Sequence, residues 1–138
     1  MTAAKATVAG LQQCLALEHE AIWVYAYLGA RVSDANKAAV RAFGRHRQSR
    51  DVLIARLSAA NATRPAPLAD YAVDEVTNLR QAATVARSLE DKSAAAYLAL
   101  VGTSEGKDRE FAITMLRKAA LATLDWGGKP IAFPGLPA

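Results

Sequence analysis

Two glutamates occupy equivalent places in two apolar-periodic stretches of the sequence. At 100° per residue, as in an α-helix, Glu18 lies at the centre of an apolar stripe over residues 8–32, and Glu90 at the centre of another over residues 79–101. A carboxylate buried without a partner costs several kcal/mol. Each glutamate therefore needs a bound metal, an opposing charge, a raised pKa that keeps it protonated, or a water-filled channel.

Candidate partners lie on the inward faces of the other two periodic stretches. One of these faces carries His46 and Arg50 among apolar residues, and the other carries Arg117 at its edge beside Ile113, Leu116, Ala120 and Leu124. Tyr25 and Tyr97 each follow a glutamate by seven residues, a spacing at which a tyrosine packs its ring and bonds its hydroxyl to the polar residue. The predicted core polar network consists of Glu18, Tyr25, His46, Arg50, Glu90, Tyr97 and Arg117.

A metal site is the alternative for the same residues. Glu18, His46 and Glu90 would form a two-carboxylate, one-histidine set suited to iron, manganese or zinc, as in a metal-dependent oxidoreductase or hydroxylase. Arg50, one helical turn from His46, argues against it, because a guanidinium stays charged and pairs with carboxylates. We therefore favour neutralisation by arginine and histidine and expect no cofactor, with iron or manganese only in the alternative.

No other residues form a recognisable reactive set. Cys14 and His19 are five residues apart, which turns them to different sides of a helix, so Cys14 is predicted to be a small core residue. Gly127 and Gly128 end a helix and form no phosphate loop. Four charged residues of the second stretch are expected on solvated outer faces: Arg45, Arg47, Asp51 and Arg56.

Breaks in the periodicity divide the chain into four helices. Turn-forming residues near 33, 61–67, 102–106 and 127–130 leave helical segments of about 6–32, 34–60, 72–102 and 107–126. Short first and third connections make those neighbours antiparallel, and the longer middle connection crosses the end of the bundle. The apolar segment 131–137 is expected to pack back without being helical. The predicted fold is an all-α antiparallel four-helix bundle forming one domain, residues 1–138.

The first and third helices resemble each other. Leu17-Glu18 with Tyr25 and Leu89-Glu90 with Tyr97 are related by the same offset of 72 residues. Such a repeat is typical of a bundle made from two related helix pairs, although two alanine-rich helices can also match by chance.

Composition limits the classes of function. The chain has 138 residues, 52% hydrophobic, with one cysteine and a net charge of +4. The cations are dispersed, which favours a solvated surface over nucleic-acid binding, and charged residues interrupt every apolar run, so no membrane segment or signal peptide is expected. We expect a cytoplasmic protein. Trp23 and Tyr27 form a second apolar face on the first helix, which either the C-terminal segment or another subunit would cover. We favour a homodimer through this face.

The combination of these features resembles the ferritin-like superfamily. The Leu17-Glu18-His19-Glu20-Ala21 stretch, the segment from His46 to Asp51, Leu89-Glu90 and Trp126 are similar to a ferritin-like family of unknown function common in actinobacteria. The resemblance covers nearly the whole chain and implies the fold, with the long crossover between helices two and three, but no activity.

The resemblance also implies where a di-iron centre would lie. The superfamily pattern takes one Glu from each of two helices and Glu-x-x-His from each of the other two. Glu18 and Glu90 match the single acids. The second helix has His46 with Ser49 and Arg50 instead, the fourth has Glu110 followed by Ile113, and the chain holds only two histidines. Two complete Glu-x-x-His motifs are therefore impossible, so the di-metal site is predicted to be degenerate, and a cage-forming iron-storage protein is disfavoured.

Overall fold

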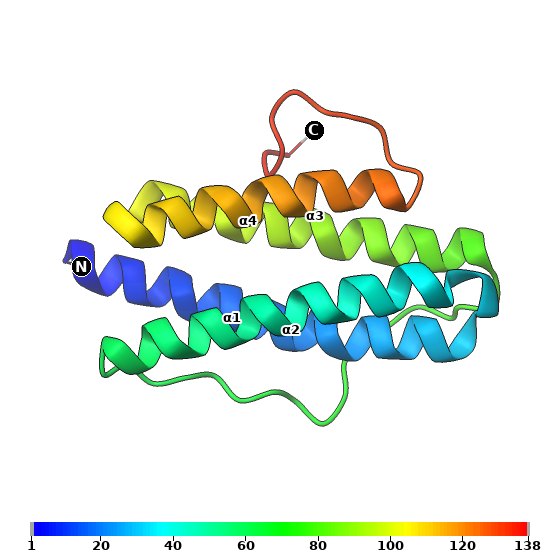
Figure 1. Ribbon diagram of the computed structural model, residues 1–138, viewed down its shortest axis with the longest axis horizontal. Helices are drawn as coiled ribbons and strands as arrows, with labels where there is room; N and C mark the ends of the chain where they lie inside the picture. The colour runs from blue at the N-terminus through cyan, green and yellow to red at the C-terminus, as the bar shows by residue number, and fades with distance from the viewer. Residues whose placement is uncertain (1, 138) are drawn as a thin grey trace.

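The chain forms four long helices that pack lengthwise against one another. The computed structural model describes residues 2–137, and within these residues the elements are α1 (Ala3–Arg31), a short 3₁₀ turn η1 (Ser33–Ala35), α2 (Asn36–Ala59), α3 (Leu79–Thr103) and α4 (Gly106–Asp125), with no strand. Figure 1 shows α1 lying beside α2 and α3 beside α4, and contacts between α1 and α3 join the two pairs. The all-helical prediction is confirmed.

Helix ends follow the local capping chemistry. The hydroxyl of Thr2 accepts a hydrogen bond from the backbone N–H of Lys5 at the start of α1, and the side chain of Asn78 does the same for Gln81 at the start of α3. The predicted start of α3 at residue 72 is wrong. Asn78 sets the start because its side-chain oxygen satisfies a free N–H there, and residues 72–77 have no regular secondary structure.

A long non-helical segment joins α2 to α3. It covers residues 60–78, called the connecting segment below, and runs along the α1–α2 pair before α3 begins (Figure 1). Its Tyr71 ring lies 6.0 Å from the ring of Trp23, centre to centre, and Trp23 stacks on Tyr27 at 5.6 Å. The second apolar face of α1 therefore packs partly against the chain itself, while the homodimer stays a prediction.

Small residues make the contact face of α4. Its fully buried positions are Ala112, Met115, Ala119 and Ala122. The predicted contact face, with Ile113, Leu116, Ala120 and Leu124, is wrong because Leu124 is exposed and the other three residues are only half-buried. Alanines allow α4 to approach α3 closely, and the larger apolar side chains are left at the flanks.

The C-terminal tail loops outside α4 (Figure 1). It touches the helices at Gly135, where an added Cβ would lie 2.8 Å from the carbonyl oxygen of Ala94 and where φ is +89°, so a glycine is required. The tail does pack back, but its large apolar side chains, Ile131, Phe133 and Leu136, remain exposed.

The core has two apolar halves separated by polar residues. One half surrounds Leu28 and Trp126, and the other surrounds Leu15 and Leu57. Between them lie buried charged and polar side chains from α1, α2 and α3. No helix of residues 2–137 has the length and apolar character needed to cross a bilayer.

Candidate functional site: a buried polar cluster

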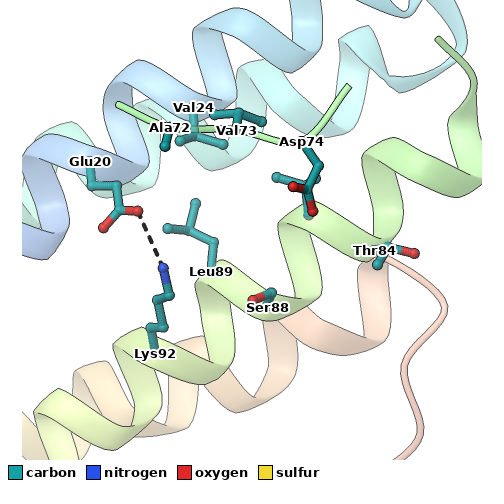
Figure 2. A pocket seen from close by; sticks show the side chains of 10 residues that line it. Glu20, Val24, Ala72, Val73, Asp74, Thr84, Ser88, Leu89 and Lys92 are labelled. Atoms are coloured by element: carbon teal, nitrogen blue, oxygen red, sulfur yellow. Dashed lines mark hydrogen bonds and ion pairs between the residues drawn. The ribbon is translucent and has the colours of Figure 1, made fainter. Parts of the chain in front are cut away.

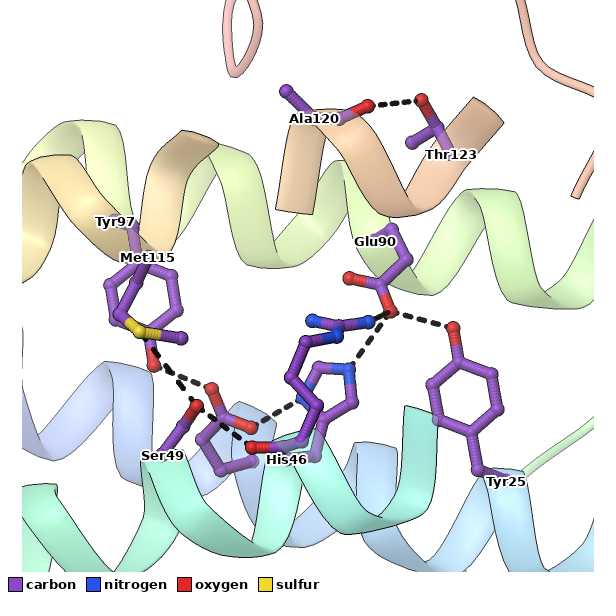
Figure 3. A network of polar contacts seen from close by, with 10 residues as sticks. Tyr25, His46, Ser49, Glu90, Tyr97, Met115, Ala120 and Thr123 are labelled. Atoms are coloured by element: carbon purple, nitrogen blue, oxygen red, sulfur yellow. Dashed lines mark hydrogen bonds and ion pairs between the residues drawn. The ribbon is translucent and has the colours of Figure 1, made fainter. Parts of the chain in front are cut away.

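Six side chains form a continuous polar cluster in the middle of the molecule. Glu18 and Tyr25 come from α1, Arg45 and His46 from α2, and Glu90 and Tyr97 from α3; we call these the polar cluster. Apart from Arg45, all are nearly inaccessible to solvent. Figure 3 shows His46 beside Glu90, with Tyr25 and Tyr97 on opposite sides.

His46 bridges the two carboxylates. Its Nδ1 lies 2.5 Å from Oε2 of Glu18 and its Nε2 lies 2.9 Å from Oε1 of Glu90. Ionised carboxylate oxygens only accept hydrogen bonds, so both ring nitrogens must carry a proton. Between two ionised carboxylates, His46 is therefore an imidazolium cation that donates to both.

The environment supports the charged form of His46. Burial alone lowers the pKa of this imidazole, but the hydrogen bonds and negative charges of Glu18 and Glu90 outweigh burial and raise it from 6.5 to about 9. For Glu90, burial raises the pKa of the carboxyl, but His46 and then Arg45 outweigh it, so the net pKa is lowered.

Arg45 supplies the second cation. Its Nη2 lies 2.5 Å from Oε1 of Glu90, and its side chain is 22% exposed, so the guanidinium connects the cluster to the surface. With His46 charged, two cations face two carboxylates and the cluster carries no net charge. Burying these four charges is tolerable only because they compensate one another.

Each tyrosine closes one end of the cluster. The hydroxyl of Tyr97 donates to Oε1 of Glu18 at 2.5 Å, and that of Tyr25 donates to Oε1 of Glu90 at 2.6 Å. Burial and the adjacent carboxylates raise the pKa of both phenols well above the ordinary value, which keeps them protonated donors. The ring of Tyr25 also stacks between His46 and Trp126, at centre distances of 5.4 and 5.9 Å.

The structure brings five of the seven predicted network residues together. Arg50 and Arg117 are not among them, which corrects the sequence analysis: Arg50 pairs with the neighbouring Asp51 at 2.7 Å, and Arg117 is exposed. Arg50 lies on the flank of α2 away from Glu90, because the buried stripe of α2 runs through Ala42, His46, Ser49 and Leu53.

Sequence reasoning missed Arg45, which it placed on an outer face. A signal was present: Ala42 and Ser49, small residues three before and four after Arg45, mark the closely packed side of α2. The same expectation is wrong for Arg56, whose Nη1 lies 2.6 Å from Asp108 and whose guanidinium lies over the ring of Phe111. Cys14 is buried as expected, and burial followed by the charge of Glu18 raises the pKa of its thiol to about 12, which makes it a poor nucleophile.

Two polar oxygens of this region lack a partner in the described residues. Oε2 of Glu90 and the hydroxyl of Ser93 are buried and form no hydrogen bond within residues 2–137. Every other carboxylate oxygen of Glu18 and Glu90 is occupied by His46, Arg45 or a tyrosine. Among residues 2–137, no group of three His, Cys, Asp or Glu side chains is arranged to hold a metal ion. The contacts of the cluster therefore set the charges of His46 and Arg45 against those of Glu18 and Glu90.

Comparison with known proteins places the chain in a family. A model of a domain of unknown function, DUF4439, matches residues 10–138. The chain belongs to this family. The DUF4439 description assigns no activity to its members. The search of curated proteins found no match.

One solved structure shares the fold over almost the full length. It is described as a conserved hypothetical protein, Rv2844, from Mycobacterium tuberculosis. It is 33% identical, the match covers 95% of this chain and 97% of that chain, and the TM-score is 0.85. The fold described above is therefore similar to one observed by crystallography.

Proposed function

We propose that this DUF4439 protein is a ferritin-like antiparallel four-helix bundle whose di-metal site is degenerate, and that it works as a binding or structural module without metal chemistry. The observation that carries the proposal is the bridging position of His46. Its two nitrogens bond to Glu18 and Glu90 at 2.5 and 2.9 Å, so a cation of the protein itself lies between the two inward carboxylates.

Two further observations support the proposal. Glu18 on α1 and Glu90 on α3 are the positions at which the ferritin-like pattern supplies single acids. The buried face of α4 offers only alanines and Met115, none of which is a hard metal ligand, and Arg45 adds a permanent positive charge beside Glu90. Protein cations thus take the electrostatic place that metal ions hold in such bundles.

Metal analysis tests the proposal directly. The protein is expressed in medium supplemented with iron and manganese, purified without chelator and examined by elemental analysis. We expect far less than one metal ion per chain, with the same trace content in a Glu18→Gln variant, and no absorbance change when anaerobic Fe(II) and then oxygen are added. Stoichiometric iron or manganese that disappears in Glu18→Gln would overturn the proposal.

A further inference from the structure

An apolar hollow lies where the C-terminal tail crosses α3 and α4; we call it the tail hollow. Its volume is about 160 Å³. Its walls include Leu121 and Leu124 of α4 and Ile131 of the tail, whose exposed fractions are 63%, 39% and 58%. These side chains offer apolar surface that residues 2–137 leave uncovered, and covering it is favourable.

A second hollow, between α1, α3 and the connecting segment, has a different character. The ion pair between Lys92 and Glu20 lies at one end of it, and Leu89 lies near its centre (Figure 2). Leu89 is only 3% exposed, so this hollow leaves little apolar surface for a partner to cover. The tail hollow is therefore the better candidate for an apolar contact.

The size and lining of the tail hollow match an aromatic ring. A dry cavity of roughly 150 Å³ with apolar walls holds a benzene molecule. Among the residues that line the tail hollow within residues 2–137, only Asp91 and Thr123 have polar side chains, and Asp91 is exposed. The hollow therefore suits a phenyl side chain better than an ion.

The tail itself presents such a side chain beside the hollow. Phe133 is 73% exposed, the largest fraction among the exposed large apolar residues of 2–137. Ile131 and Pro134 line the tail hollow but Phe133 does not, so its ring lies outside the hollow of its own chain. The backbone N–H of Leu136 donates to the carbonyl oxygen of Phe133 at 3.3 Å, so a turn holds the backbone that carries the ring. A ring held in place loses less freedom when it binds.

The charges around Leu121 favour a second copy of this chain as the partner. Arg117 and Asp125 lie one helical turn before and one turn after Leu121; both are exposed, and neither forms an ion pair within residues 2–137. If two copies of α4 cross antiparallel at Leu121, Arg117 of each copy faces Asp125 of the other. The face is therefore complementary to itself in charge, as a two-fold interface requires.

We propose that two copies of this chain associate through this face about a two-fold axis, with Phe133 of each copy inserted into the tail hollow of the other. Because the ring and the hollow lie side by side on one face, a single rotation supplies both contacts. The interface does not include Trp23 and Tyr27 of α1. The inference goes beyond the proposed function and does not depend on the polar cluster.

Sedimentation equilibrium of the full chain tests the inference. We expect a monomer–dimer equilibrium with a dissociation constant on the order of micromolar, since one aromatic side chain per copy carries the contact. Phe133→Ser should raise this constant at least tenfold without changing the fold, because the ring is exposed in the single chain. Leu68→Ser is the matched control: Leu68 is 64% exposed and does not line the tail hollow, so its dissociation constant should equal that of the unmodified chain.

A mixing experiment distinguishes reciprocal insertion from other apolar association. Ala120 lines the tail hollow, so Ala120→Phe fills the hollow and should also weaken self-association at least tenfold. An equimolar mixture of Ala120→Phe and Phe133→Ser should dimerise more tightly than either variant alone, because the open hollow of the second accepts Phe133 of the first. Circular dichroism checks that each variant keeps its helical content.

Four results would each overturn the inference. They are a chain that stays monomeric at hundreds of micromolar, assemblies larger than a dimer, an unchanged dissociation constant in Phe133→Ser, and a mixture that associates no more tightly than its components. Metal analysis of the polar cluster is a separate measurement, so failure of either proposal is recognised independently.

Discussion

His46 is the residue on which the interior depends most. It contacts Glu18 and Glu90 and is almost fully buried, so each carboxylate has its charge compensated where water cannot reach it. Removing one partner leaves an uncompensated buried charge, which is more damaging than removing an exposed ion pair.

Replacement of Glu18 tests this compensation. Glu18→Gln keeps the shape but removes the charge opposite His46, and we expect the free energy of unfolding to fall by about 3–5 kcal/mol. Glu20→Gln removes a partner from the more exposed pair with Lys92 and should cost less than about 1 kcal/mol. Urea denaturation of both variants measures the difference. Equal losses would show that the buried charge of Glu18 is not special.

The two arginines of α2 provide a second comparison. Arg45→Met leaves buried Glu90 with one cation fewer and should lower the free energy of unfolding by about 2–4 kcal/mol. Arg50→Met only breaks the pair with exposed Asp51 and should change it by less than about 1 kcal/mol. The same urea titrations apply. A larger loss of stability for Arg50→Met than for Arg45→Met would support the prediction that Arg50 belongs to the core polar network.

At the scale of the helices, hydrophobic periodicity predicted the elements that carry the cluster and most of its residues. It identified the four helices and the inward direction of Glu18, His46 and Glu90, because a carboxylate among apolar residues at helical spacing can face only inward. It could not identify Arg45, because the pattern of one helix does not say which flank faces which neighbour. The alanine-rich contact face of α4 was missed for a related reason. Large apolar residues were assigned to the core, although close contacts between helices need small residues.

Two glycines in helices test the packing of these elements. A Cβ added at Gly44 in α2 meets nothing within 4 Å, so Gly44→Ala should raise the free energy of unfolding by about 0.5–1 kcal/mol through reduced freedom of the unfolded chain. At Gly10 in α1 the Cβ would lie 2.9 Å from Cδ1 of fully buried Leu100, so Gly10→Ala should bring no gain. Thermal and urea unfolding of both variants measure this contrast, and stabilisation by Gly10→Ala would contradict the packing of α1 on α3.

At the scale of the whole molecule, stability should depend on pH through the cluster. The pKa of His46 is raised from 6.5 to about 9, so the folded protein holds this proton more tightly than the unfolded chain does. The resulting stabilisation is complete below pH 6.5 and is lost as the pH rises through 9. The lowered pKa of Glu90 acts oppositely: its contribution is present above pH 4.5 and is lost as the pH falls.

We therefore expect the free energy of unfolding to decline between pH 6.5 and 9, by roughly a few kcal/mol. Urea titrations across this range measure the decline, in a His19→Gln background because burial lowers the pKa of His19 and its titration would add a slope of opposite sign. Added His46→Gln should abolish the decline. A stability that rises from pH 6.5 to 9 would contradict the charged state of His46.

The homodimer remains a prediction at this scale, checked by sedimentation equilibrium. The apolar face on which it was based already packs partly against Tyr71 of the connecting segment.

The position of the polar cluster between two apolar halves has a consequence for how the helices are aligned. A slide of α3 by one turn, about 5.4 Å, would carry Glu90 away from His46 and into aliphatic surroundings. Leucine and alanine contacts alone would tolerate such a shift, because one apolar turn replaces another at little cost. The charged layer thus favours one longitudinal alignment of α1, α2 and α3 and penalises neighbouring ones.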